Sequence, residues 1–352
     1  MSQTIKEKTI KTGAGPRVTK IFGAALLSTA AIYVLIDKIR FQRSAMAALS
    51  EAYLRVTGRR DRYLTKEKAE AFMEGRGKKR LKAPYAPSPV ILKDPRLTFE
   101  TGELPKLIYT PDEPAEATVL FLHGGAFVSE MTRHHELFVA ALGRELKARV
   151  IAPAYPLAPE HTFDDAVREV LELYREIQKE AKGSGPFVLM GDSAGASLAA
   201  GLCVEIGEGR YAQSDPALTL PDRLILISPA LDLTLSNPED DKLEAKDPML
   251  AGIGVRVMAK RWAGTEDPAS PECSPLFAGP SVFKGTEVTL FAGTREILYP
   301  DIVAFTEHLK EAGIPVRLHI GRDLNHDYPL FPIPEALEAM NQIREAVFNA
   351  RS

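Results

Sequence analysis

The chain has 352 residues, of which 45% are hydrophobic and 26% are charged, a composition typical of a globular protein. Its formal net charge of −3 gives no indication of nucleic-acid binding. We therefore expect no nucleic-acid partner. The two cysteines, Cys203 and Cys273, are too few for a disulfide framework and lack the spacing of a zinc site, so we also expect no metal ion.

An uncharged run extends from Ile21 to Ile36, after a basic N-terminal stretch. Its length fits the apolar region of a secretory signal and is just below the roughly 17–25 residues of a membrane-spanning helix. Cleavage near Ala30 would leave an apolar N-terminus, so we predict that the run is retained as a membrane anchor on an otherwise cytoplasmic protein. The alternatives are an exposed amphipathic helix and a helix packed in a cap over the folded domain. The charges on the two flanks do not decide the topology of an anchor.

Composition divides the remaining chain into segments. Residues 1–40 form the basic segment with the predicted anchor, and residues 41–90 form a charged, helix-prone segment that ends in a cluster of prolines. Residues 91–352 form the largest predicted domain. A stretch rich in proline and aspartate, at about residues 233–284, interrupts this domain and is predicted to be an insertion.

The large domain alternates between short apolar runs and amphipathic stretches. A hairpin is predicted at residues 97–100 and 106–109. Apolar runs predict buried strands at residues 118–122, 150–152, 187–190, 224–227, 288–291 and 316–320. Helical periodicity predicts helices at about residues 137–146, 167–177, 194–206, 302–309 and 336–348. This alternation predicts a parallel sheet with helices on both faces.

A Gly-x-Ser-x-Gly motif, residues Gly191 to Gly195, lies between a predicted strand and an apolar helix. A serine on a tight strand-to-helix turn projects its hydroxyl out of the sheet, and the flanking glycines let the turn close. The turn also places Ser193 at a helix N-terminus, where the helix dipole favours developing negative charge. Ser193 is therefore the predicted nucleophile.

A second glycine motif follows the strand predicted at residues 118–122. It contains Gly124 and Gly125. The tetrahedral intermediate of acyl transfer carries an oxyanion, which is stabilised by backbone N–H donors. We predict that Gly124, Gly125 and Ala194, the residue after the nucleophile, supply these donors.

The predicted base is His326, which stands in a loop after the last predicted strand. In the α/β-hydrolase fold the triad residues follow the order serine, acid, histidine, and His326 fits this order. The adjacent residues His134 and His135 do not share a helix face, so we predict that they begin a solvated helix and do not bind a metal ion.

The acid of the triad is expected after the strand at residues 288–291. Two candidates follow that strand, Glu296 and Asp301. Glu296 is closer to the strand end, whereas Asp301 is placed in the first turn of the next helix, where an acid complements the dipole. The sequence therefore favours Glu296 as the partner of His326.

Five blocks together resemble the hormone-sensitive-lipase-like branch of the α/β-hydrolases, especially its bacterial esterases. The blocks are His123 to Phe127, Tyr155 to His161, Gly191 to Gly195, Gly293 to Asp301, and Asn325 to Pro329. The resemblance implies an eight-stranded, mostly parallel sheet with a helical cap, which we assign to residues 41–90 and to the insertion at about residues 233–284. It also implies carboxylesterase activity, no cofactor, and an oxyanion hole from the loop glycines and the residue after the serine. Two departures from the usual pattern are Ala126, in place of a third glycine, and Glu296, where an aspartate is more common.

These observations predict a serine carboxylesterase that acts on a small-molecule ester with a short acyl chain through an acyl-enzyme. An amidase or deacetylase with the same triad is the alternative enzyme. A non-catalytic small-molecule-binding protein on this fold is disfavoured because Ser193, Glu296 and His326 are all present. The sequence gives no indication of an oligomeric state.

Overall fold

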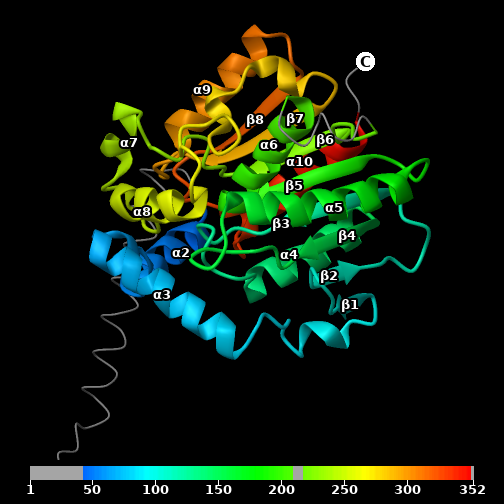
Figure 1. Ribbon diagram of the computed structural model, residues 1–352, viewed down its shortest axis with the longest axis horizontal. Helices are drawn as coiled ribbons and strands as arrows, with labels where there is room; N and C mark the ends of the chain where they lie inside the picture. Colours follow the sequence, from blue (N-terminus) through cyan, green and yellow to red (C-terminus); the bar gives the residue numbers. More distant parts are fainter. Residues whose placement is uncertain (1–42, 209–216, 350–352) are drawn as a thin grey trace, which may run out of the picture.

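The computed structural model describes residues 43–208 and 217–349 and contains an eight-stranded sheet (Figure 1). The strands lie in the order β1-β2-β4-β3-β5-β6-β7-β8. They are β1 (Leu97–Glu100), β2 (Lys106–Tyr109), β3 (Ala117–Leu122), β4 (Ala148–Pro153), β5 (Phe187–Asp192), β6 (Arg223–Ile227), β7 (Glu287–Gly293) and β8 (Val316–Gly321). β2 pairs antiparallel with β1 and β4, and all other neighbours are parallel. The predicted fold class is thereby confirmed.

Two hydrophobic layers, one on each face, hold the sheet between helices. The larger layer contains the apolar sides of α5, α6 and α9, and the smaller one contains those of α4 and α10. The bounds of these helices are α4 (Arg133–Glu145), α5 (Phe163–Ala181), α6 (Ser193–Gly207), α9 (Tyr299–Glu311) and α10 (Pro334–Phe348). Because both faces are covered, every residue of β3 and β5 is buried, as the continuous apolar runs predict.

Two further helical segments pack onto these layers, one before β1 and one between β6 and β7. The first contains α2 (Ala45–Val56), the 3₁₀ helix η1 (Arg59–Tyr63) and α3 (Lys66–Lys82). The second contains α7 (Pro238–Leu243) and α8 (Gly252–Ala263). Both α3 and η1 contact α8, and Figure 1 shows α2, α3 and α8 gathered at one side of the sheet. Segments about 190 residues apart in the chain therefore form one helical group.

The helix-prone stretch after residue 41 is not continuous. Ser44 and Thr65 cap α2 and α3 by accepting backbone N–H bonds with their side chains. Between these helices, Gly58 adopts a left-handed φ of 62°, which ends α2 and starts η1. The positive φ is what favours glycine here, because the one close neighbour of an added Cβ is the movable carboxylate of Asp61.

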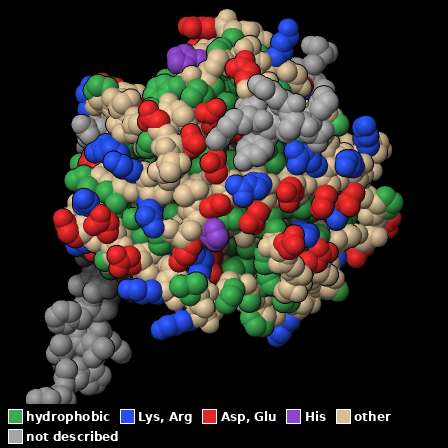
Figure 2. All heavy atoms as spheres, viewed as in Figure 1, with side chains coloured by type: hydrophobic (Ala, Val, Ile, Leu, Met, Phe, Trp, Pro, Cys, Tyr) green, Lys and Arg blue, Asp and Glu red, His purple; other side chains and the backbone are tan. Residues whose placement is uncertain are grey.

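The predicted anchor from Ile21 to Ile36 lies outside the described residues. Among the residues that are described, no helix combines the length and the apolar character needed to cross a bilayer. On the face in Figure 2, acidic and basic side chains are interspersed and hydrophobic ones form small groups. The described part of this face therefore carries no broad basic surface of the kind that binds nucleic acid.

Candidate active site

Ser193 lies at the sharp turn from β5 into α6. Its backbone adopts a left-handed φ of 50°, which is uncommon for a residue with a Cβ. A Cβ on Gly195 would lie 2.0 Å from the carbonyl oxygen of Leu122, so only glycine lets the turn pack this close to β3. The motif therefore directs the Ser193 hydroxyl into the cavity at the carboxyl end of the sheet.

The structure brings Ser193, His326 and Glu296 into one chain of contacts. Nε2 of His326 lies 2.9 Å from Oγ of Ser193, and Nδ1 of His326 lies 2.5 Å from Oε2 of Glu296. Glu296 and His326 are almost fully buried, and Ser193 is 9% exposed. The imidazole thus has a carboxylate on one nitrogen and a hydroxyl on the other, which is the arrangement of a serine, histidine and acid triad.

Two groups to which the sequence analysis assigned no role at the site fix the position of Glu296. Its Oε1 accepts hydrogen bonds from the Ser228 hydroxyl, at 3.0 Å, and from the Gly293 N–H, at 2.7 Å. Ser228 follows β6, and its oxygen also accepts the N–H of Asp327 at 3.0 Å. The sequence could have indicated Ser228, because it is a polar residue that directly follows β6, and β6 ends at the same edge of the sheet as the strand before Ser193.

Asp301, the other candidate acid, does not approach the imidazole. It lies in the first turn of α9, where its Oδ1 accepts a hydrogen bond from the amide of Asn237 at 3.0 Å. Burial raises the pKa of Asp301 to about 6. The structure therefore joins Glu296, and not Asp301, to His326.

Asp327 places a second carboxylate beside His326. Its Oδ2 lies 3.2 Å from Nε2 of the imidazole, the nitrogen that faces Ser193. Burial opposes protonation of His326, but the charges on Asp327 and Glu296 outweigh it and raise the pKa to about 10. Burial also raises the pKa of Asp327, an effect that His326 opposes, so the two groups titrate as a pair.

Asp192, next to the nucleophile, holds the glycine loop. Its carboxylate accepts the Gly124 N–H at 2.8 Å and lies 3.1 Å from Nε2 of His135. Burial disfavours the charge on Asp192, yet His135 and the Gly124 N–H outweigh burial and lower its pKa. The prediction of a solvated helix start agrees with the exposure of His134 but is wrong for His135, which is buried against Asp192.

The bond from Gly124 to Asp192 changes the predicted oxyanion hole. A Cβ on Gly124 would lie 2.3 Å from the Asp192 carboxylate and 3.0 Å from Cβ of Ser193, so the loop is pressed against the nucleophile turn. Because the Gly124 N–H already donates to Asp192, this predicted donor is not directed at the reaction centre. Gly125 and Ala194 remain the two predicted donors.

A cavity of about 390 Å³ opens at Ser193. Its walls come from the sheet edge and from the helical segments at residues 43–82 and 233–284. Most of the surface of these walls is apolar, and its contributors include Leu49, Leu54, Tyr63, Met249, Leu250 and Phe331. Ligand sites of about 300–1,000 Å³ with mostly apolar walls and a few polar groups are typical of small-molecule binding. Within the described ranges, no three His, Cys, Asp or Glu residues are grouped to hold a metal ion.

Comparison with known proteins gives a consistent result. Residues 119–330 match a family described as having the alpha/beta hydrolase fold. An esterase of Acinetobacter venetianus is 29% identical over 235 residues, which are 66% of this chain and 74% of that protein. An ethyl acetate hydrolase of Pseudomonas putida is 28% identical over 274 residues, which are 74% of this chain and 84% of that protein. The crystal structure of an esterase from the bacterial hormone-sensitive lipase family is 25% identical, with a TM-score of 0.63 over 80% of this chain and 96% of the other.

Proposed function

The chain belongs to the hormone-sensitive-lipase-like branch of the α/β-hydrolase fold family, and on this premise we propose that it is a serine carboxylesterase with Ser193 as nucleophile. The contact between the Ser193 hydroxyl and Nε2 of His326, at 2.9 Å, carries the proposal. The names of two relatives, an esterase and an ethyl acetate hydrolase, support ester bonds as the target.

In the acylation step, His326 removes the hydroxyl proton of Ser193 as the serine oxygen attacks the ester carbonyl. Glu296 stabilises the imidazolium that forms. The Gly125 and Ala194 N–H groups are the proposed donors to the oxyanion. The carbon–oxygen bond of the ester then breaks, the leaving alkoxide takes the proton from Nε2, and the acyl group remains on Ser193.

Deacylation repeats these roles with water. His326 removes a proton from the water molecule as its oxygen attacks the acyl-enzyme. The second tetrahedral intermediate collapses, and the imidazolium returns the proton to the Ser193 oxygen. The products are a carboxylic acid and the free enzyme, so the cycle requires no cofactor.

We further propose that two segments, residues 41–85 and 233–284, act as a cap on the catalytic domain. Their described parts supply Leu49, Leu54, Tyr63 and Leu250 to the cavity wall. A cavity of about 390 Å³ is near the lower end of the size range for ligand sites, which supports a short acyl chain. A cap of this kind also excludes water from the reacting groups.

The experiment is turnover of p-nitrophenyl acetate, butyrate and octanoate by the purified protein and by Ser193→Ala. Loss of the nucleophile should lower kcat by about 10⁴–10⁶-fold, as removal of a triad serine does in other hydrolases. Ser50→Ala removes another serine hydroxyl from the cavity wall and should stay close to wild type. Activity of Ser193→Ala within tenfold of wild type would contradict the proposal. Hydrolysis of an anilide at rates above those of the esters would favour an amidase.

A further inference from the structure

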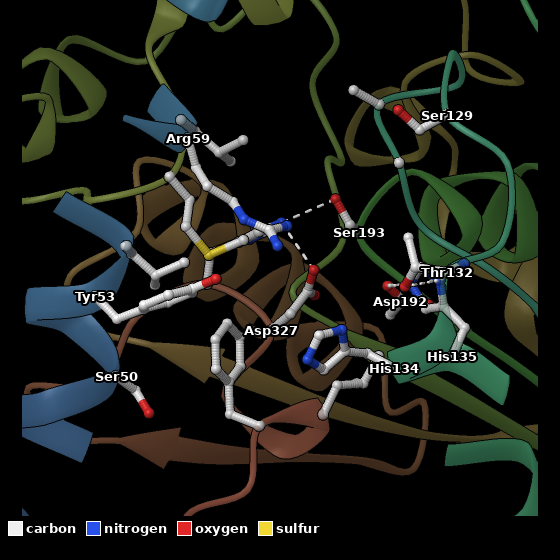
Figure 3. Close-up of a pocket in the computed structure, with 18 of the residues that line it drawn as sticks. Ser50, Tyr53, Arg59, Ser129, Thr132, His134, His135, Asp192, Ser193 and Asp327 are labelled. Atoms are coloured by element: carbon white, nitrogen blue, oxygen red, sulfur yellow. Dashed lines mark hydrogen bonds and ion pairs between the residues drawn. The ribbon is translucent and has the colours of Figure 1, made fainter. Parts of the chain in front are cut away.

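Two arginines of the 3₁₀ helix η1 enter the cavity that contains Ser193. Arg59 and Arg62 both line it, and Figure 3 shows Arg59 extending into the cavity from the side of Tyr53. In a 3₁₀ helix, residues three apart lie on the same face, so both side chains point the same way. Arg60 points elsewhere, because its guanidinium donates to the carbonyl of Leu250 and to Glu244.

The backbone around η1 is fixed, so the position of Arg59 is not incidental. The left-handed Gly58 sets the direction in which the chain leaves α2. At the other end, Tyr63 is buried, and a Cβ on Gly254 of α8 would lie 2.3 Å from the Tyr63 Cα. The hydrogen bond from Arg60 to the Leu250 carbonyl also joins η1 to the segment at residues 233–284. Arg59 therefore extends from a supported backbone.

The positive charge of this wall has no carboxylate partner. Within the part of the chain that the structure describes, no acidic group lies within ion-pair distance of either Arg59 or Arg62. The two acids on the cavity wall already have partners: Asp192 contacts His135, and Asp327 contacts His326.

Arg62 shows the same unmet bonding capacity in a more buried position. Its guanidinium carbon lies 4.8 Å from the ring centre of Phe72 and 5.3 Å from that of Tyr63. Its Nε is buried and has no hydrogen-bond partner. A buried polar group without a partner is rare, since it loses its bonds to water without replacement. An anion between the two arginines would bind the part of the Arg62 guanidinium that lines the cavity, next to the enclosed Nε.

We propose that the physiological substrate is an ester carrying a free carboxylate, and that Arg59 and Arg62 bind this carboxylate while Ser193 attacks the ester. The inference rests on the proposed esterase function and specifies its substrate class. A guanidinium binds a carboxylate with two parallel hydrogen bonds, which fixes orientation as well as charge. A cationic group in the same position would be repelled. The carboxylate belongs either to the acyl part or to the alcohol part of the ester, and these two sources are separable.

The test compares kcat/KM for charged and neutral esters of similar size. Monomethyl glutarate carries the carboxylate on the acyl side, and methyl pentanoate is its neutral counterpart. For the alcohol side, 4-acetoxybutanoate is compared with butyl acetate. We expect Arg59→Gln to lower the charged-to-neutral ratio of kcat/KM by roughly 3–30-fold for one of the two pairs, a range reduced for the exposure of Arg59. Arg59→Lys keeps the charge and should recover part of the ratio.

Arg168→Gln is the matched control, because Arg168 is an exposed arginine of α5 outside the cavity. It should leave the ratio and the activity unchanged. Added salt should lower the wild-type ratio, since screening weakens an exposed ion pair. A ratio that Arg59→Gln does not change for either pair would overturn the inference while neutral esters still report the esterase. If wild type hydrolyses none of the four esters, the inference is overturned, and turnover of p-nitrophenyl acetate then shows whether the proposed esterase function fails as well.

Discussion

The two walls of the cavity differ in whether their polar side chains have partners within the protein. On the wall made by the sheet edge, both oxygens of Glu296 and both ring nitrogens of His326 have partners. On the wall made by η1, Arg59 and Arg62 have no carboxylate partner among the described residues. Groups that must hold one geometry are fixed by buried hydrogen bonds, whereas groups that bind a ligand keep capacity for it.

The first way to test this contrast is to remove the charge that orients His326. Glu296→Gln should lower kcat by about 10²–10⁴-fold, because the imidazole loses the carboxylate that fixes its tautomer and stabilises its cation. Asp301→Asn changes an equally buried carboxyl that contacts Asn237 instead. It should affect kcat much less, as measured with p-nitrophenyl butyrate. If Asp301→Asn lowered kcat more than Glu296→Gln, the assignment of Glu296 as the acid would be wrong.

A smaller effect is expected at Ser228, which joins Glu296 to the loop of Asp327. Ser228→Ala removes the hydroxyl that donates to Glu296 and accepts from the Asp327 N–H. We expect kcat to fall by roughly 3–30-fold, since Gly293 still holds the carboxylate. Ser274→Ala removes a buried serine with two hydrogen bonds elsewhere in the insertion, and it should lower thermal stability without this loss of kcat. Equal losses of kcat in both variants would reduce Ser228 to a structural residue.

The pH profile tests the second carboxylate at His326. A general base must be neutral, so kcat/KM should rise with pH through the pKa of the His326 pair, which lies above the ordinary 6.5. Removing a negative neighbour lowers that pKa, so Asp327→Asn should move the rising limb to lower pH by about one to three units. Asparagine tolerates the left-handed φ of 57° at this position.

Asp323→Asn is the matched control for this profile, because Asp323 has a similar φ of 55° in the same loop. Its rising limb should coincide with that of wild type. A limb that stays in place in Asp327→Asn would show that Asp327 does not act on the base.

The smallest expected effect concerns the part of the cavity wall that the cap segments supply. Wild type should hydrolyse p-nitrophenyl acetate or butyrate faster than octanoate. Tyr53→Ala opens an apolar part of the wall and should raise the octanoate-to-butyrate ratio of kcat/KM by about two- to fivefold, less than a fully enclosed pocket would give. Val56→Ala, on the same helix but outside the cavity, should leave this ratio unchanged. A maximum rate on emulsified long-chain triglycerides would refute the short-chain preference.

Much of the sheet was predictable because its strands are buried on both faces. The apolar runs at β3, β5, β6 and β7 identify strands directly, with ends that differ by one or two residues. The helical character of residues 41–82 was predictable, but no boundary was predicted between α2, η1 and α3. A glycine after Thr57 was the local sign of the boundary between α2 and η1.

In the candidate site, too, some contacts were predictable from the sequence and others were not. Ser193, Glu296 and His326 follow strands in an order that the fold requires, so their proximity was predictable from the sequence. The contact of Asp192 with His135 and Gly124 was not, because it depends on the packing of α4 against the nucleophile turn. Ser228 was missed for a similar reason, since its partner Glu296 lies 68 residues away in the chain. Arg59 was missed because the cavity that it lines is formed only when the helical segments fold over the sheet edge.

The most direct test of the central claim is the site of covalent modification by a fluorophosphonate. The Ser193 oxygen should displace fluoride and form one phosphonyl adduct per chain, located by mass spectrometry of the peptide that contains residues 191–195. His326→Gln should slow the labelling, because the hydroxyl then lacks its base. An adduct on another serine, or ester turnover that continues at the wild-type rate after Ser193 is fully modified, would contradict the account.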